Sequence, residues 1–314
     1  MLEYRAYNID GKTLGGKHIK HYIFLLIIFN IVIPILFINI LTPIKSEIIS
    51  DFFEISLYIR ESDEIVKIPF EEYISQVVYA EMPASFEIEA LKAQAIAVRS
   101  YTYRKINSKN HKNYDVCDDP KHCQAWKAID TSEDYKKIVQ AVESTKGKIA
   151  LYGGDVINAV YHASSGGFTE AAINVWNGHE DYLISVESPN EEKIMKDYTS
   201  EIVLDKKEFL KKLELKESKK VNVEILNKTK GNRIKEIRIN QTIFTGNRIR
   251  EIFNLRSSNF EVFLDGENIK FVVCGYGHGV GLSQWGAQAM ALEGKKAEEI
   301  IKHYYVGVEI GDIS

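Results

Sequence analysis

One glutamate, Glu81, has the sequence position expected of a catalytic acid. It shares a helix face with three apolar residues at helical spacing, which are Ile74, Val77 and Val78. Burial on such a face raises a carboxyl pKa, because it disfavours the ionised form, and a protonated carboxyl group at neutral pH is what general acid catalysis needs. The alternative is a structural glutamate that pairs with Arg99 on the next helix.

A polar loop concentrates four soft metal ligands, and these are His111, Cys117, His122 and Cys123. Thiolate and imidazole groups at short spacing suit tetrahedral zinc, although this spacing matches no standard C-x-x-C ribbon. A disulfide between Cys117 and Cys123 outside the cell and unpaired surface residues are the alternatives.

Two glycine-bearing segments are candidates for lining a cleft. Residues 275–281 place four alternate glycines between a predicted strand and a predicted helix, so backbone N–H groups can approach a ligand closely. The pattern is neither a Walker A loop nor G-x-G-x-x-G, which argues against a nucleotide site. Within it, His278 either contacts substrate or satisfies the loop's own backbone. The segment 161–167 follows a strand and is expected to line the same cleft.

Hydrophobic periodicity predicts the elements that position these residues. Strands are expected within 51–70, a helix over 71–82, and a second helix from about Ser85, its expected N-cap, to about Ile106. The pattern further predicts a helix over 133–146, a hairpin turning at Gly153 and Gly154, a strand-rich stretch over 201–270 with a short helix at 247–253, and a strand, glycine loop and two helices at the C-terminal end.

Composition and charge narrow the class of protein. The 314 residues carry 40 Lys and Arg against 44 Asp and Glu, a formal net charge of −4, which excludes a disordered chain and a basic nucleic-acid binder. Residues 22–41 contain no charged side chain and in helical form span about 30 Å, so they predict a transmembrane helix. The basic excess of residues 1–21 predicts a cytoplasmic tail. A cleaved signal peptide is the alternative, but no A-x-A site follows.

Three segments together resemble one family. AEMPASFEIEALKAQAIAVRSYTY (80–103), YHASSGGFTE (161–170) and GYGHGVGLSQWGAQAMA (275–291) are similar to the stage II sporulation protein D family of peptidoglycan lytic transglycosylases, and KEIRINQTIFTGNRIREIFNLRSS (235–258) also follows its pattern. The resemblance extends from about residue 50 to the C-terminal end.

The resemblance implies non-hydrolytic cleavage of the MurNAc–GlcNAc β-1,4 bond in peptide-stripped glycan strands, leaving 1,6-anhydroMurNAc ends. Glu81 occupies the position of the family's catalytic glutamate and would act as both acid and base. A paired-carboxylate hydrolase needs a second carboxylate, and its candidates here are Asp115, Asp118, Asp119 and Glu170.

The resemblance also implies the remaining site residues. The residues expected to contact substrate are Arg99, Tyr161, His278, Ser283 and Gln284. Zinc is expected near the cleft in a positioning or structural role, on His111, Cys117 and Cys123 with His122 as the weaker fourth ligand, while the acid–base step itself needs no metal. A non-catalytic wall-binding amidase modifier and a muramidase-type hydrolase are the alternative functions.

The expected fold is α+β. A helical catalytic lobe, 44–190 with 270–314, would contain an inserted strand-rich lobe, 191–269, after the cytoplasmic tail (1–21) and transmembrane anchor (22–41). Family membership implies a role in engulfment during endospore formation, beside a membrane-anchored amidase and a membrane scaffold protein. The catalytic domain would face the space between mother cell and forespore. No nucleic-acid partner is expected.

Overall fold

The computed structural model describes residues 53–313 except 110, 129–131, 177 and 219. The described residues from Glu54 onward form one compact unit. The predicted anchor, 22–41, lies outside the described residues and stays a prediction. Among the helices described, none combines the length and apolar character needed to cross a membrane.

Helices and small sheets alternate along the chain, so the α+β class is confirmed. In the described residues, the eight α-helices are α3 (Phe70–Glu81), α4 (Ile88–Asn107), α5 (Glu133–Glu143), α6 (Glu191–Ile194), α7 (Lys206–Lys212), α8 (Gly246–Phe253), α9 (Gln284–Leu292) and α10 (Ala297–Tyr304), and a 3-10 turn covers Ala172–Asn174.

The strands form five small sheets within the described residues. They are β1 (Glu54–Ile59), β2 (Glu64–Pro69), β3 (Val116–Cys117), β4 (Lys148–Tyr152), β5 (Asp155–Val156), β6 (Tyr161–His162), β7 (Thr199–Asp205), β8 (Val223–Lys228), β9 (Ile234–Ile239), β10 (Thr242–Thr245), β11 (Phe260–Asp265), β12 (Asn268–Cys274), β13 (Leu282–Ser283) and β14 (Glu309–Asp312).

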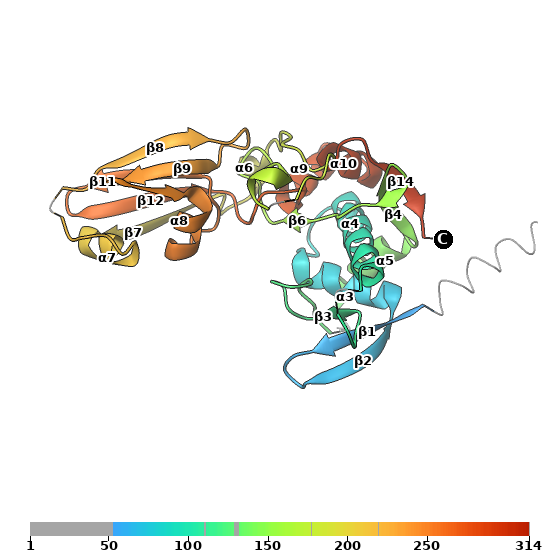
Figure 1. The fold of residues 1–314 in the computed structure, drawn as a ribbon. Coiled ribbons are helices and arrows are strands. Elements are labelled where there is room, and N and C mark those ends of the chain that lie inside the picture. The colour runs from blue at the N-terminus through green and yellow to red at the C-terminus, as the bar shows by residue number, and fades with distance from the viewer. Residues whose placement is uncertain (1–52, 110, 129–131, 177, 219, 314) are drawn as a thin grey trace, which may run out of the picture. The chain divides into compact units, whose positions relative to one another are not determined.

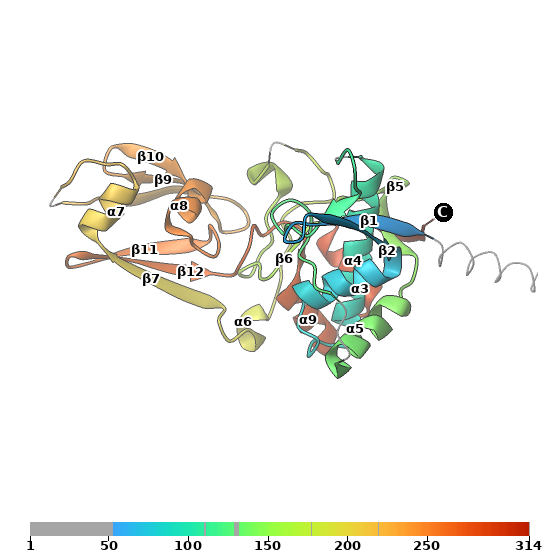
Figure 2. The ribbon, with the colours of Figure 1, turned by 90° about the horizontal axis from the view of Figure 1, so that it is seen from below.

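Two separate hydrophobic cores hold these elements. The larger core surrounds α4, which packs against α3, α5, α9 and α10, and Figure 2 shows α3, α4, α5 and α9 together. The second core lies among β7, β9, β12, α7 and α8, which are grouped with β8 and β11 in Figure 1. Its buried residues run from Leu204 to Val273, so the strand-rich stretch has a core of its own.

Most predicted elements form, with shifts at their ends. The hairpin turns at Gly153 and Gly154, which both have positive φ, as a tight turn between β4 and β5 requires. The predicted N-cap of the second helix is wrong. The helix begins at Ile88 after Glu87, which has no side-chain capping bond, and Ser85 lies in the turn after Pro83.

Candidate active site around Glu81

Glu81 is the last residue of α3 and is half-buried. The apolar residues of the same helix, Ile74, Val77 and Val78, are completely buried and anchor α3 in the larger core. The helix ends here because Met82 adopts an extended conformation and Pro83 follows. The packing of α3 therefore brings the Glu81 carboxyl group to the edge of the core.

Three groups from distant parts of the chain surround this carboxyl group. The backbone N–H of Ala125 donates a hydrogen bond of 3.0 Å to Glu81 Oε1. Gln284 and Tyr161 make further polar contacts with Glu81. Burial raises the pKa of Glu81, and these three contacts lower it by less, so the pKa lies above that of an ordinary glutamate. Such a group stays protonated closer to neutral pH.

A short parallel pairing brings the second and third sequence motifs together. Strand β13 pairs with β6, with Leu282 opposite Tyr161 and Ser283 opposite His162. Gln284 follows at the start of α9, is almost fully buried, and its Nε2 has no hydrogen-bond partner among the described residues. The pairing thus places the Gln284 amide beside the Glu81 carboxyl group.

Tyr161 connects Glu81 to the loop after the cysteines. Its hydroxyl donates to Gln124 Oε1 at 3.0 Å, and Gln124 Nε2 donates to Thr102 Oγ1 at 2.8 Å. Trp126 Nε1 donates to Gln76 Oε1 at 2.6 Å. Burial raises the pKa of Tyr161 well above its usual value, so the phenol remains protonated. These bonds hold residues 124–126 against α3 and α4.

The glycine loop places His278 next to this site. Its Nδ1 accepts a hydrogen bond of 3.0 Å from the N–H of Val280, and burial lowers the pKa of His278 to about 4. The imidazole is therefore neutral at physiological pH and packs against Trp176, with ring centres 5.0 Å apart. Trp176 is 40% exposed, so an aromatic surface lies beside the loop.

The four predicted metal ligands meet in space. The ligand atoms of His111, Cys117, His122 and Cys123 all lie within 4.8 Å of one another. His111 Nε2 is 3.3 Å from Cys123 Sγ, and Cys117 Sγ is 3.5 Å from His122 Nδ1. Sulfur and nitrogen ligands of a tetrahedral zinc ion are about 3.5 Å apart, so the donor set fits zinc. Cys117 and Cys123 form no disulfide in the structure.

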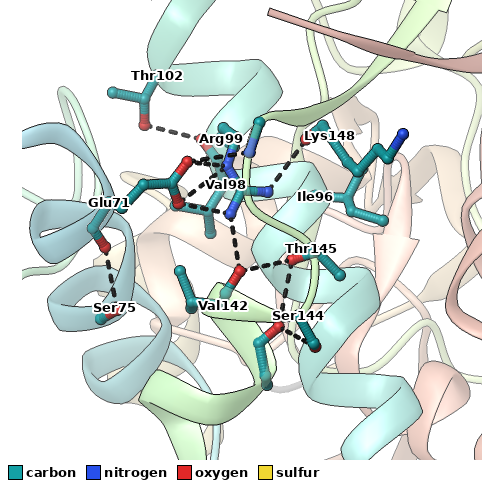
Figure 3. Close-up of polar contacts among 12 residues, drawn as sticks. Glu71, Ser75, Ile96, Val98, Arg99, Thr102, Val142, Ser144, Thr145 and Lys148 are labelled. Atoms are coloured by element: carbon teal, nitrogen blue, oxygen red, sulfur yellow. Dashed lines mark hydrogen bonds and ion pairs between the residues drawn. The ribbon is translucent and has the colours of Figure 1, made fainter. Parts of the chain in front are cut away.

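The structure corrects the predicted roles of Arg99. Its side chain is completely buried and binds Glu71 through Nε and Nη2, at 2.9 and 2.7 Å, instead of pairing with Glu81. Figure 3 shows that the carbonyl groups of Val142 and Lys148 accept its other hydrogen bonds. Arg99 joins α3, α4 and α5 inside the core and is not available to a substrate.

Ser283, also expected to contact substrate, is likewise fully buried. Its hydroxyl donates to Glu191 Oε1 at 2.8 Å and also caps α9 through the N–H of Gly286. Glu191 is completely buried and accepts further hydrogen bonds from the hydroxyls of Ser164, Ser165 and Ser188. Glu191 therefore ties the segment 161–167 to Ser283, which follows the glycine loop, and Ser283 has a structural role in this junction.

The four candidates for a second carboxylate are bound elsewhere. Asp115 accepts hydrogen bonds from the N–H and hydroxyl of Ser56, and Asp118 and Asp119 form ion pairs with Arg60. Glu170 accepts hydrogen bonds from three groups, which are the side chains of Asn174 and Thr229 and the backbone of Ala171. None of the groups that change the pKa of Glu81 is acidic.

Sequence reasoning missed four contributors to the site: Gln124, Ala125, Trp176 and Glu191. Ala125 acts through its backbone, so its side chain gives no signal. Gln124 and Ala125 do follow Cys123 directly, and that position is the one available hint. Glu191 lies in a short polar stretch, and only its burial among serine hydroxyls reveals its role.

Comparison with known proteins places the chain among sporulation proteins. The family model described as "Stage II sporulation protein" matches residues 58–152. The stage II sporulation protein D of Bacillus subtilis is 36% identical over 271 residues, covering 82% of this chain and 79% of the relative. That of Bacillus amyloliquefaciens is also 36% identical, with 82% and 78% covered.

A second type of relative is also similar to this chain. The amidase enhancer of Bacillus subtilis is 30% identical over 288 residues, which cover 74% of this chain and 39% of that protein. This chain belongs to the stage II sporulation protein D family.

Proposed function

We propose that this protein is a peptidoglycan lytic transglycosylase that acts on peptide-stripped glycan strands during engulfment in endospore formation. The observation that carries the proposal is the environment of Glu81. This carboxyl group is half-buried, has a raised pKa, and is contacted by groups from three separate segments of the chain, none of them acidic. One carboxyl group in such a setting can serve first as acid and then as base.

The chemistry needs only this carboxyl group and the substrate. Protonated Glu81 transfers its proton to the glycosidic oxygen as the bond from C1 of N-acetylmuramic acid (MurNAc) to that oxygen breaks. The resulting carboxylate then takes the proton of the C6 hydroxyl of the same sugar, whose oxygen forms the new bond to C1. Glu81 returns to its protonated state, and no water is consumed.

The surrounding residues would position the sugars. The Gln284 amide would orient the Glu81 carboxyl group or a sugar beside it, and the Tyr161 hydroxyl remains protonated through the reaction. His278 is neutral and next to the exposed ring of Trp176, so the two form a surface on which a sugar ring can pack. Arg99 and Ser283 have no part in this proposal.

Zinc at the cysteine loop would hold residues in position and would take no part in the reaction. His111, Cys117, His122 and Cys123 would hold it. The chain continues from Cys123 directly into Gln124 and Ala125, which contact Tyr161 and Glu81. A metal bound to the loop would therefore fix the start of the segment that orients the proposed acid.

The family and the sequence support a setting at the membrane beside the cell wall. Anchoring by residues 22–41, with the catalytic domain outside the cytoplasmic membrane, would hold Glu81 beside the wall. The proposed partners are the glycan strand, an amidase that strips stem peptides and a membrane scaffold protein of engulfment.

One incubation tests the function. The full chain in mild detergent is mixed with peptide-free glycan strands, and the products are weighed by mass spectrometry. Fragments with anhydro ends are expected. Fragments heavier by one water would show that the protein is a muramidase and not a lyase. Intact strands would contradict both proposed activities.

A wall-binding module is the second candidate, and the amidase enhancer relative favours it. In that case Glu81 would be structural and strands would remain intact. Binding of strands by the native chain, with no cleavage at any pH between 4 and 8, would support the module.

A further inference from the structure

The arginines that the structure describes fall into two groups. Five of them form ion pairs with carboxylates, and these are Arg60, Arg99, Arg104, Arg238 and Arg248. Within the described part of the chain, the other three have no carboxylate at ion-pair distance. These three, Arg233, Arg250 and Arg256, all lie around the glycine loop of residues 275–281.

Arg233 is the buried member of this group. It donates to the carbonyls of Ser165 and His278, at 3.1 and 3.3 Å, and lies against Gly279, where any Cβ would overlap its guanidinium. Burial lowers the pKa of Arg233 to about 10, so its charge is retained at neutral pH. Arg233 thus supports the loop from inside and makes its surroundings electropositive.

Arg250 and Arg256 reach the exposed side of the same loop. The guanidinium of Arg256 lies 5.4 Å from the ring centre of Tyr276, which is 49% exposed. The backbone carbonyl of Arg256 accepts a hydrogen bond of 2.9 Å from the N–H of Gly277. The aromatic ring and this backbone bond hold Arg256 in place beside the loop. Arg250, on α8, is also half-buried, and it is close enough to Tyr276 to interact with it.

Most donors of these two guanidinium groups remain available. Arg256 uses Nη1 for the carbonyl of Asp197 at 3.2 Å, and Arg250 uses Nε for that of Leu255 at 3.3 Å. Each guanidinium has five N–H groups, and neither makes another hydrogen bond to a described residue. Glu251 stabilises the charge of Arg250 from beyond ion-pair distance and is itself paired with Arg248. Two half-buried guanidinium groups with no carboxylate at ion-pair distance among the described residues suit the binding of an anion.

The glycine loop connects this surface to Glu81. Two residues after Tyr276, the side chain of His278 contacts the backbone of Tyr161, and Tyr161 contacts Glu81. A glycan strand that presents its scissile bond to Glu81 and packs on His278 would therefore continue along the loop toward Tyr276.

We infer that Arg250 and Arg256 bind the lactyl carboxylate of a MurNAc residue in the strand. This inference rests on the proposed function. In a strand with stem peptides the lactyl carbonyl belongs to an uncharged amide, and after stripping it is an ionised carboxylate. Two guanidinium groups can form charge-assisted hydrogen bonds with the ionised carboxylate, whereas the neutral amide offers them no negative charge. The pair would thus select stripped strands.

A binding measurement tests the inference without requiring cleavage. The full chain with Glu81→Gln is titrated in a calorimeter with peptide-free MurNAc–GlcNAc oligomers and with the same oligomers whose lactyl groups are methyl amides. We expect the free carboxylate to bind about tenfold or more tightly than the amide. Adding Arg250→Gln and Arg256→Gln should remove this preference while leaving the weak binding of the amide unchanged.

Arg248→Gln is the matched control, because Arg248 lies on the same helix but is exposed and paired with Glu251. It should keep the preference. Equal binding of both oligomers by the parent chain, or a preference that survives both Arg→Gln changes, would overturn the inference. Polyglycerol phosphate is the competing anion, and displacement of the oligomer by it at equal charge concentration would assign the arginines to phosphate instead.

The outcome is independent of the proposed reaction. If the native chain made no anhydro ends, the proposed transglycosylase activity would be contradicted. The preference of the chain for the carboxylate oligomer could still be measured. If the double variant unfolds, the single variants Arg250→Gln and Arg256→Gln are titrated instead, and each should lose several-fold of the preference.

Discussion

The backbone N–H of Ala125 donates a 3.0 Å hydrogen bond to Oε1 of Glu81, from a position 44 residues further along the chain. Ala125 follows Cys123 by two residues, so the cluster of cysteines and histidines and the proposed acid are joined by one short segment. Tyr161 and Trp126 hold the same segment in place through Gln124 and Gln76. The segment that follows the cysteine loop and the proposed acid therefore belong to one hydrogen-bonded unit.

Replacing the proposed acid should abolish cleavage without unfolding the protein. Glu81→Gln keeps the shape of the side chain and removes its proton transfer, so we expect the rate of anhydro-end formation to fall by about 10²–10⁴-fold. The measurement is mass spectrometry of products from peptide-free strands, with circular dichroism to verify the fold. The exposed Glu133→Gln is the control and should cleave normally. Full activity in Glu81→Gln would refute the catalytic assignment.

The same substitution should alter the pH dependence of stability. Burial raises the pKa of Glu81 in the folded protein, so the folded state holds this proton more tightly than the unfolded chain. The contribution of Glu81 to stability is fully present below the unfolded pKa, about 4.3, and is lost as the pH rises through the raised folded pKa.

Glu81→Gln stays neutral at every pH, so its stability relative to the native chain should be higher at pH 7 than at pH 4. Urea unfolding midpoints at the two pH values measure this difference. A difference that does not change with pH would show that Glu81 is not in a desolvated environment.

Breaking the buried pair of Arg99 and Glu71 should destabilise the fold. Arg99 is completely buried, and Glu71→Ala would leave its charge without a partner, at a cost of about 3–5 kcal/mol in the free energy of unfolding. Denaturant unfolding gives the value. Lys136→Ala, in an exposed pair with Glu133, is the control and should cost less than about 1 kcal/mol.

Removing both charges together should cost less than removing one. We expect the double variant Glu71→Leu with Arg99→Met to recover part of the stability lost by Glu71→Ala, because no isolated buried charge remains. If Glu71→Ala is no less stable than the native chain, the pair does not hold α3 to α4.

The cysteine loop should carry about one zinc per chain. Elemental analysis of the purified full chain measures the metal, and Cys117→Ser with Cys123→Ser should remove it and lower the melting temperature. Cys274→Ser is the control, because Cys274 lies outside the ligand cluster. An intact mass lower by two hydrogens, with no metal, would establish a disulfide and contradict the zinc proposal.

The local elements of the site could be predicted from the sequence because they depend on local patterns. The spacing of Ile74, Val77 and Val78 places Glu81 on the inward face of α3, and the glycines at 153 and 154 determine a tight hairpin. The convergence of the four candidate ligands was also predictable, since these residues lie close together in the chain.

The hydrogen-bond partners of the buried polar groups were decided only by the tertiary structure. Arg99 is near Glu81 in the chain, yet the packing of α4 against α3 and α5 directs it to Glu71 and to the carbonyls of Val142 and Lys148. The side chains of Ala125 and Glu191 carry no sequence signal, because Ala125 acts through its backbone and Glu191 gains its role from burial among serines. Residue type and periodicity fix which face of a helix is buried, whereas the contact that each buried polar group makes depends on long-range packing.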